Sequence, residues 1–422
     1  MRAILAGVAF AALFTACSNG SSSSTTTSPT AAAVSTAAPK ANASAAGANN
    51  GEIIKIGVDL PVSGADASTG IPTQNGAVLA IEEAHLPHGF TLAADLLDDA
   101  VQGVHDPAAG AQNVKNFISD GSVLAMVGPF NSNVAKSEIP LTNDAGLVQI
   151  SPANTNDTLT VGKDAQQLRT SHPDTNTYFR DCTRDSVQGS ALAKFAKKLG
   201  WKHVFIVDDN ETYGKGLADV FDQTFQTGGG TVAGHEHITK NQQDFKALLT
   251  KAKSQRPDGV FYGGTTSTGG GLVRRQMADV GLSNVPFMGG DGISDSEFVK
   301  TAGPMANNSY YSVAAPDANK LPSAKSFVAR YKARFKSEIG PYSANGYAAA
   351  QVEIAAIAKA IDAAGGKMPA RADVLRNVAA TKNLATPIGS LGFDANGDPT
   401  APILTISKIV GGHAQSLFVG SK

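Results

Sequence analysis

Short strand patterns alternate with helix patterns along most of this chain. Runs rich in valine, isoleucine and leucine predict strands over residues 53–58, 92–97, 123–127 and 148–150. Apolar residues at helical spacing predict helices between them, over residues 74–85, 107–118 and 132–145. Parallel strands need such crossovers, and strands that are apolar throughout are covered on both faces. The sequence therefore predicts an α/β fold with a doubly wound parallel sheet.

The same alternation begins again after about residue 173. Strands are expected over residues 204–207, 231–237, 259–262 and 286–288, with helices over residues 187–199, 214–227, 245–254 and 272–280. The two units are similar in length, so we expect two doubly wound lobes in tandem. Further strands over residues 310–313 and 403–410 and helices over residues 324–336 and 343–364 are too few for a third lobe. We expect them to complete the first two.

Residues 1–16 have the layout of a bacterial secretion signal. Arg2 precedes an apolar run, and small residues lead to Cys17, the position at which a lipoprotein is cleaved and acylated. The apolar run is shorter than the roughly 20 residues that span a bilayer, which disfavours a transmembrane helix. We predict a signal peptide over residues 1–16 and lipidation of Cys17. An ordinary signal peptide with a chance cysteine is the alternative, since Phe14 stands where leucine is usual.

A segment rich in serine, threonine and alanine follows, over residues 17–51. It has almost no aromatic or charged residues, so it cannot bury enough apolar surface to fold by itself. We expect a disordered tether with a reach on the order of 30 Å, enough to hold a folded body just off a lipid surface.

The charge balance limits the kind of partner. The chain has 35 basic and 36 acidic residues, whereas binding to nucleic acid or to an anionic membrane needs a positive excess. We expect a neutral or zwitterionic small molecule as ligand. Only two cysteines are present. If Cys17 is lipidated, Cys182 has no intrachain partner for a disulfide, and burial is its expected role.

Polar residues follow the predicted strands, where open α/β sheets bind ligands. Ser132 comes after the strand over residues 123–127, at the start of a helix, and Thr155 follows the next strand. Hydroxyl groups and helix N–H groups suit a carboxylate. In the second unit Tyr213 and Asp291 lie at matching strand ends, where an acid suits an ammonium group. Helix capping and turn formation are the alternative roles for Ser132, Thr155 and Asp291.

Catalytic motifs are absent from the sequence. We find no nucleophile elbow, no phosphate-binding loop and no zinc-protease motif, and the glycine-rich residues 263–271 lack the ending of a phosphate loop. His235 and His237 share one face of a strand, but an exposed edge is favoured over a metal site because no third ligand is near in sequence. The aspartate pairs at residues 98–99 and 208–209 are expected as turn formers. The sequence predicts no cofactor and no metal.

Several motifs in order resemble the leucine/isoleucine/valine-binding proteins of bacterial ATP-driven uptake systems. They include Gly128-Pro129-Phe130, Ser151-Pro152-Ala153-Asn154-Thr155, Tyr213-Gly214-Lys215-Gly216 and Phe287-Met288-Gly289-Gly290-Asp291-Gly292. The resemblance covers residues 52–422. It implies a type I periplasmic-binding fold, with two Rossmann-like lobes and three hinge crossings. Lobe 1 is expected over residues 52–173 plus 304–393, and lobe 2 over residues 174–303 plus 394–422.

The resemblance also implies roles for individual residues. Ser132, Thr155 and the backbone of Ala153 would hold a ligand carboxylate, while Tyr213 and Asp291 would face the ammonium group. Three further ligand-binding positions differ from those of branched-chain binders: Thr69 and Thr265 stand where tyrosine is usual, and Tyr342 stands where phenylalanine occurs.

The expected function is that of a monomeric, lipid-anchored binding component of an uptake transporter, without catalysis. It would bind an amino acid, with the branched-chain type as one candidate, and deliver it to an ABC permease in the membrane. Small amides and aromatic acids are alternative ligands. A ligand-sensing domain of the same fold is the rival function, disfavoured because no transmembrane or signalling segment follows the last strand. An enzyme is the third option.

Overall fold

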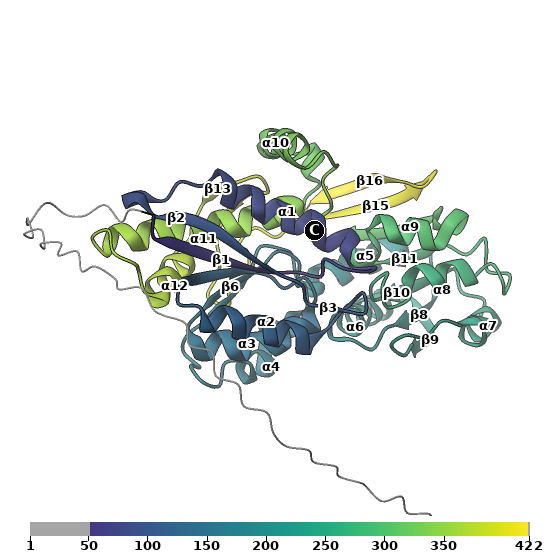
Figure 1. The fold of residues 1–422 in the computed structure, drawn as a ribbon. Helices are drawn as coiled ribbons and strands as arrows, with labels where there is room; N and C mark the ends of the chain where they lie inside the picture. Colours follow the sequence, from purple (N-terminus) through teal and green to yellow (C-terminus); the bar gives the residue numbers. More distant parts are fainter. Residues whose placement is uncertain (1–50, 421–422) are drawn as a thin grey trace, which may run out of the picture. The chain divides into compact units, whose positions relative to one another are not determined.

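Two sheets organise residues 51–420, which are the residues that the computed structural model describes (Figure 1). The first sheet is parallel throughout, with the order β2-β1-β5-β6-β7. Its strands are β1 (Ile53–Asp59), β2 (Thr91–Leu97), β5 (Val123–Val127), β6 (Val148–Ser151) and β7 (Tyr178–Arg180). The central strands β5 and β6 are buried along their whole length, as expected for a sheet covered on both faces.

The N-terminal predictions cannot be compared with this structure. The signal peptide over residues 1–16, the lipidated Cys17 and nearly all of the tether over residues 17–51 lie outside the described residues.

The second sheet has seven strands in the order β16-β15-β12-β11-β10-β8-β9. They are β8 (His203–Asp208), β9 (Thr231–His237), β10 (Gly259–Gly263), β11 (Phe287–Gly289), β12 (Ser309–Val313), β15 (Leu404–Val410) and β16 (His413–Gly420). The strands from β12 to β9 are parallel, while β15 and β16 are antiparallel to their neighbours. Strand β9 therefore forms one edge of the sheet and β16 the other.

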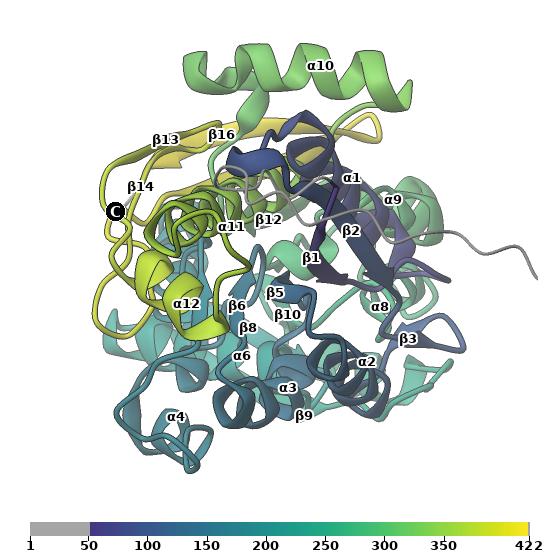
Figure 2. The same ribbon diagram turned by 60° about the vertical axis from the view of Figure 1, so that its left-hand side comes forward.

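Helices cover both faces of the first sheet. Figure 2 shows α1, α11 and α12 on one side of β1, β5 and β6, and α2 and α3 on the other. The helices of this lobe are α1 (Ala67–Glu83), α2 (Pro107–Ser119), α3 (Ser132–Ala145), α4 (Gly162–Gln167), α10 (Lys325–Phe335), α11 (Ser343–Ala363) and α12 (Arg371–Ala379). Helices α1 and α11 approach closely at Gly76, where a Cβ atom would lie 2.0 Å from the Ser343 carbonyl oxygen. Glycine is therefore required there.

The second lobe has its own helices and turns. Its helices are α5 (Asp185–Lys198), α6 (Thr212–Thr227), α7 (Lys246–Ser254), α8 (Gly270–Gln276) and α9 (Ser296–Ala302).

Smaller elements occur along the whole chain. Two small hairpins pair β3 (Ala100–Val101) with β4 (Val104–His105) and β13 (Leu384–Thr386) with β14 (Gly389–Leu391). Short 3₁₀ helices occur at η1 (Pro87–Gly89), η2 (Asp157–Leu159), η3 (Asp291–Ile293), η4 (Gly303–Ala306), η5 (Ala318–Lys320) and η6 (Pro322–Ala324).

The chain changes sheets at places that differ from the predicted lobe boundaries. Strand β7 pairs with β6, so the first sheet extends beyond residue 173. Strand β12 pairs with β11 and β15, so the strand predicted over residues 310–313 lies in the second sheet and not in lobe 1. The buried side chains of β12 explain this position, because they pack into the core of the second lobe, where Tyr310 contacts Phe195. A local pattern predicts a strand but not its neighbours.

Two further differences concern element ends. Helix α1 starts at Ala67 and runs through Pro72, seven residues before the predicted start at residue 74. Side-chain hydrogen bonds from Thr69 Oγ1 to Asp66 O and from Thr73 Oγ1 to Thr69 O support this first stretch, and Gly70 packs against Pro61. These contacts thus compensate for the helical hydrogen bond that Pro72 cannot make, because proline has no backbone N–H. Strand β16 was not predicted, because its side chains are mostly exposed and show no apolar alternation.

Candidate functional site

Loops from both lobes meet at a small cavity. It measures about 20 Å³, and its lining residues are Phe130, Asn131, Ser132, Ala153, Tyr213, Thr265, Asp291 and Gly292. The first four follow β5 and β6, and the others follow β8, β10 and β11 of the second sheet. Five of the eight predicted binding residues line this cavity: Ser132, Ala153, Tyr213, Thr265 and Asp291.

The first lobe contributes hydroxyl and helix N–H groups. Ser132 is the first residue of α3, and its hydroxyl accepts a weak hydrogen bond from the Asn156 N–H at 3.4 Å. Thr155 Oγ1 and Asn131 Oδ1 are buried and have no hydrogen-bond partner within residues 51–420. Burying an unpaired polar atom costs free energy, so such atoms point to an external partner. The start of α3 also favours negative charge, which makes this wall suitable for a carboxylate.

The second lobe contributes an acid. Asp291 Oδ1 accepts hydrogen bonds from Gln188 Nε2 at 2.6 Å and from the Tyr213 hydroxyl at 3.1 Å. The Tyr213 hydroxyl in turn accepts the Gly292 N–H at 3.1 Å, which fixes its position. Burial raises the pKa of Asp291, whereas hydrogen bonds from Gln188, Tyr213 and Tyr342 oppose this shift. A cation beside Asp291 would stabilise its ionised form.

Asp185 is a second acid close to Asp291, although it is not among the lining residues of the cavity, and no sequence pattern pointed to it. It is the first residue of α5 and is buried, and neither of its side-chain oxygens has a hydrogen-bond partner in the part of the chain that the structure describes. Burial, and after it the charge of Asp291, raise the pKa of Asp185 well above its usual range, while the nearby Thr155 hydroxyl opposes the shift. Its place just after β7 is a strand end, so the rule that identified Ser132 would have identified it if β7 had been predicted.

Two other predicted residues lie near the cavity, and one does not. The Tyr342 ring contacts the Phe130 ring edge-on at 5.5 Å, and its hydroxyl accepts the Ala314 N–H at 3.1 Å. Thr155 is buried in the turn after β6, and its carbonyl accepts the Asp185 N–H. Thr69 lies in the first turn of α1, where its hydroxyl donates to Asp66 O. The structure does not place Thr69 among the lining residues.

A buried ion pair supports the turn that carries Ala153 and Thr155. Arg180 is fully buried, and its Nη1 donates to the carbonyls of Asn154 at 2.9 Å and Asn156 at 2.8 Å. Its Nε pairs with Asp398 Oδ1 at 2.7 Å. The buried thiol of Cys182 also donates to Asn154 O, and burial raises the pKa of this thiol well above its usual range. Cys182 therefore has a structural position, as expected.

Asp66, His105 and Glu211 form a second contact between the lobes, which we call the rim. His105 Nδ1 is 2.8 Å from Asp66 Oδ2 in the first lobe, and its Nε2 is 2.7 Å from Glu211 Oε2, next to α6. Burial alone would lower the pKa of His105, but the two carboxylates raise it well above the usual range. A positively charged His105 thus joins the lobes. No sequence signal marked it, since its partners are 39 and 106 residues away.

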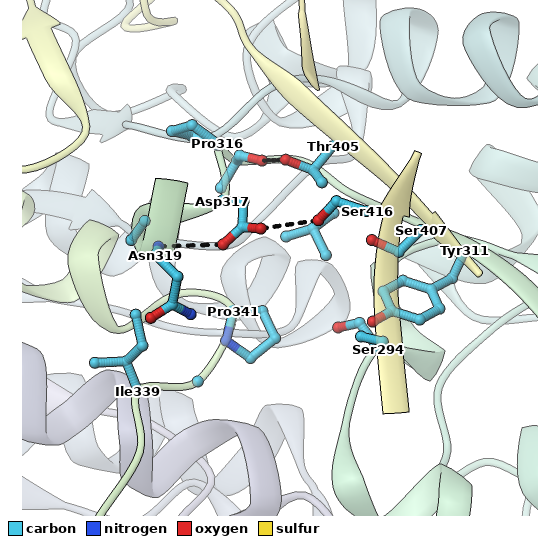
Figure 3. A pocket seen from close by; sticks show the side chains of 15 residues that line it. Ser294, Tyr311, Pro316, Asp317, Asn319, Ile339, Pro341, Thr405, Ser407 and Ser416 are labelled. Carbon is cyan, nitrogen blue, oxygen red and sulfur yellow. Dashed lines mark hydrogen bonds between the residues drawn. The ribbon is translucent and has the colours of Figure 1, made fainter. Parts of the chain in front are cut away.

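A larger cavity of about 290 Å³ lies away from these residues, beside β12, β15 and β16 (Figure 3). Its only acid, Asp317, already accepts hydrogen bonds from Ser416 Oγ at 2.8 Å and from the Asn319 N–H at 3.1 Å. Asp317 also lies 3.7 Å from Lys320 Nζ, so its charge already has a counter-ion, whereas Asp291 has hydrogen-bond donors but no ion pair within residues 51–420.

Comparison with known proteins identifies the family. Residues 53–412 match the model of the periplasmic binding proteins. The chain belongs to this family. Its relatives include the Leu/Ile/Val-binding protein BraC3 of Rhizobium johnstonii, 32% identical over 84% of this chain and 91% of that protein. The Leu/Ile/Val-binding protein homolog 3 of Brucella melitensis is 31% identical with the same coverage.

Solved structures agree with the fold of this periplasmic binding protein. The leucine binding protein LivK of Thermotoga maritima has a TM-score of 0.76 at 26% identity, over 87% of this chain and 99% of that one. LivJ of Streptococcus pneumoniae, solved with isoleucine, has a TM-score of 0.75 at 26% identity, over 88% of this chain and 100% of that one. The two Rossmann-like lobes and the type I periplasmic-binding fold are thereby confirmed. Within residues 51–420, no helix combines the length and apolarity needed to cross a bilayer.

Proposed function

We propose that this periplasmic binding protein is the extracytoplasmic component of an ABC uptake transporter and that it binds an amino acid between its lobes. The observation that carries the proposal is the opposition of charges across the small cavity. One wall has Ser132 and the start of α3, and the other has Asp291. A zwitterion would complement both walls.

The unpaired groups suggest how the ligand is oriented. Its carboxylate would contact the hydroxyls of Ser132 and Thr155 and the backbone of Ala153, and its ammonium group would lie beside Asp291, Asp185 and Tyr213. These contacts come from both lobes, so ligand favours the closed arrangement. The cavity of about 20 Å³ is smaller than the roughly 300 Å³ of typical ligand pockets, so entry requires the lobes to separate.

The chain crosses between the sheets at three neighbouring places, which we propose as the hinge. Thr183 N donates to Ala314 O at 2.8 Å, and Thr183 Oγ1 donates to Ile403 O at 2.7 Å. These residues follow β7, follow β12 and precede β15. Lobe 1 would then be the part of the chain around the first sheet, and lobe 2 the part around the second.

The names of relatives favour a branched-chain ligand, and the acids favour an amino acid over an aromatic acid. A solute-binding protein of Rhodopseudomonas palustris with this fold was solved with benzoate, at 21% identity and a TM-score of 0.73. Benzoate has no ammonium group and would offer Asp291 neither a positive charge nor a hydrogen-bond donor. Thr265 adds a polar hydroxyl to the lining of the small cavity, and this hydroxyl lies 2.8 Å from Ser267 Oγ.

A thermal-shift screen followed by calorimetry tests the ligand class. Leucine, isoleucine, valine, other amino acids, small amides and benzoate would be compared. A ligand at 100 times its Kd stabilises the folded state by about 2.7 kcal/mol, which raises the melting temperature measurably. We expect amino acids to do so. Stabilisation by benzoate or amides, but by no amino acid, would contradict the proposal.

We further propose that Cys17 is lipidated and holds the protein at the membrane near its permease, as a monomer. The support is the sequence before Cys17 and the composition of residues 17–51. Mass spectrometry of the mature N-terminus tests this proposal, and an unmodified start at another residue would contradict it.

A further inference from the structure

Three potential metal ligands converge at the edge of the second sheet, away from the proposed amino-acid site. Asp208, His235 and His237 each offer a ligand atom, and these atoms lie within 4.8 Å of one another. His235 Nε2 is 2.7 Å from Asp208 Oδ2, and His237 Nδ1 is 2.8 Å from both Asp208 oxygens. The sequence could not show the third member, because Asp208 is 27 residues from His235.

Strand geometry produces this convergence. His235 and His237 are two residues apart in β9, so their side chains lie on the same face. Asp208 ends β8 and is the register partner of His237, which places its side chain opposite the two imidazoles. The imidazole rings are 5.4 Å apart. Both strands are regular where these residues lie, so the three side chains are held by the sheet rather than by a loop.

A fourth residue supports one of the histidines from behind. The second ring nitrogen of His235, Nδ1, lies 3.1 Å from Asp222 Oδ2 in α6. Histidines that bind metals almost always donate their other N–H to a carboxylate or carbonyl, which fixes the ring and its tautomer. An exposed pair of histidines on a sheet edge does not need such a partner. Asp222 therefore provides the supporting carboxylate that a metal-bound His235 would need.

We propose that Asp208, His235 and His237 form a site for a divalent transition-metal ion, with zinc as the best match. Two imidazole nitrogens and one carboxylate suit zinc, whereas magnesium and calcium prefer oxygen ligands. Asp222 is the positioning residue for His235. Three protein ligands leave one tetrahedral position for water or another ligand, and the His237 side chain is 49% exposed, so this position is open to solvent.

The two nitrogen-to-oxygen distances need only a small adjustment to hold the ion, and the two imidazole nitrogens lie within 4.8 Å of each other. Bonds of about 2.0–2.1 Å to a tetrahedral zinc place the ligand atoms roughly 3.3 Å apart. The present nitrogen-to-oxygen distances of 2.7 and 2.8 Å are about half an ångström shorter. His237 can move by this amount because its side chain is half-exposed, while buried Asp208 stays fixed by the Asn210 N–H on its Oδ1 at 2.8 Å.

Calorimetric titration with ZnCl₂ of the purified protein, first treated with a chelator, tests the site. We expect one zinc ion per chain, and no comparable binding of MgCl₂. His235→Ala and His237→Ala should each weaken zinc binding at least a hundredfold. Asp222→Asn should weaken it about 10- to 100-fold, as loss of a supporting carboxylate does. His203→Ala is the matched control, because this exposed histidine begins β8 at the opposite end of the strand and should leave zinc affinity within twofold.

Cobalt substitution adds a spectroscopic readout, since tetrahedral Co²⁺ with nitrogen ligands absorbs visible light far more strongly, and at longer wavelength, than hexaaquo Co²⁺ does. The absorption should appear with the wild-type protein and with His203→Ala, and it should disappear with His237→Ala. Circular dichroism of each variant establishes that it is folded. The proposal is overturned if the wild-type protein binds no zinc saturably, or if folded His235→Ala and His237→Ala variants bind it with undiminished affinity.

Discussion

Two polar regions join the lobes, and they differ in whether their charges already have partners. At the rim, His105 lies between Asp66 and Glu211, and both ring nitrogens are hydrogen-bonded. At the centre, Thr155 Oγ1 and both oxygens of Asp185 have no hydrogen-bond partner among the described residues. The protein itself completes the rim contact, whereas a ligand would have to complete the central one.

This difference separates closure from selection. A complete ion pair at the rim stabilises the closed arrangement whatever the cavity contains, and its strength depends on the protonation of His105. The unpaired groups at the centre penalise closure unless a ligand supplies a cation and an anion. On this view the rim sets how easily the lobes close, and the centre sets what they close on. The following predictions test this division.

The largest effect should follow loss of the support beneath the central wall. Arg180→Met removes the nearest cation from buried Asp398, which keeps only Arg184 at 3.5 Å and the Thr160 hydroxyl at 3.1 Å, and it frees the carbonyls of Asn154 and Asn156. Breaking a buried pair costs about 3–5 kcal/mol of unfolding free energy. Chemical denaturation measures this loss. Arg184→Met is the matched control, since Arg184 approaches the same Asp398 at 3.5 Å but is partly exposed, and it should cost far less. Equal losses would show that Arg180 has no special place beneath the turn.

The next largest effect concerns the acid at the centre. Asp291→Ala should weaken amino-acid binding at least tenfold, because a charge-assisted hydrogen bond in a closed site contributes about 1.5–3 kcal/mol. Calorimetry measures the change, with circular dichroism as the folding control. Asp317→Ala removes an acid from the larger cavity and should leave affinity unchanged. If Asp291→Ala binds as tightly as the wild type, Asp291 is a turn former and the zwitterion model fails.

A smaller effect is expected at the rim. Glu211→Gln removes one charge from His105 and should weaken ligand binding about fivefold, roughly 1 kcal/mol, because Glu211 is partly exposed and solvent screens the pair. The selectivity among amino acids should not change, since the centre is intact. Small-angle scattering without ligand should show a larger radius of gyration for Glu211→Gln than for the wild type. Altered selectivity would contradict the division between rim and centre.

The rim should also respond to pH. The pKa of His105 is raised in the folded protein, so the stability that its charge contributes is present below about pH 6.5 and is lost as the pH rises through the folded pKa. The pKa of Asp66 is lowered: burial acts against this shift, but His105 outweighs it, and the stability from Asp66 is lost as the pH falls below about 3.9. We expect the His105→Gln variant to lose the alkaline dependence when its melting temperature is compared with that of the wild type across pH.

The smallest effect is expected for the hydroxyl at the start of α3. Ser132→Ala should weaken ligand binding about two- to threefold, less than Asp291→Ala, because the N–H groups of the helix still face the carboxylate. Calorimetry on the two single variants and their combination measures the order. A loss larger than that of Asp291→Ala would mean that the hydroxyl, rather than the acid, dominates recognition.

Local patterns in the sequence determined the elements and the fold class. Apolar runs such as residues 123–127 form strands because a buried strand needs apolar side chains on both faces, whatever lies elsewhere in the chain. The rule that ligands lie beyond strand ends pointed to Ser132 and Asp291, and the structure places both at one cavity. The order of motifs indicated the family, which the comparisons confirm.

Only the tertiary structure decided which distant residues become neighbours. The sheet to which β12 belongs, the pair of Arg180 with Asp398 and the contact of His105 with Glu211 each join residues that no short window contains. Asp208 likewise reaches His235 and His237 only because β8 and β9 pair in that register. Register and lobe contacts are set by the packing of whole sheets and helices. The sequence therefore shows which residues are charged, but not which residues they contact in the folded protein.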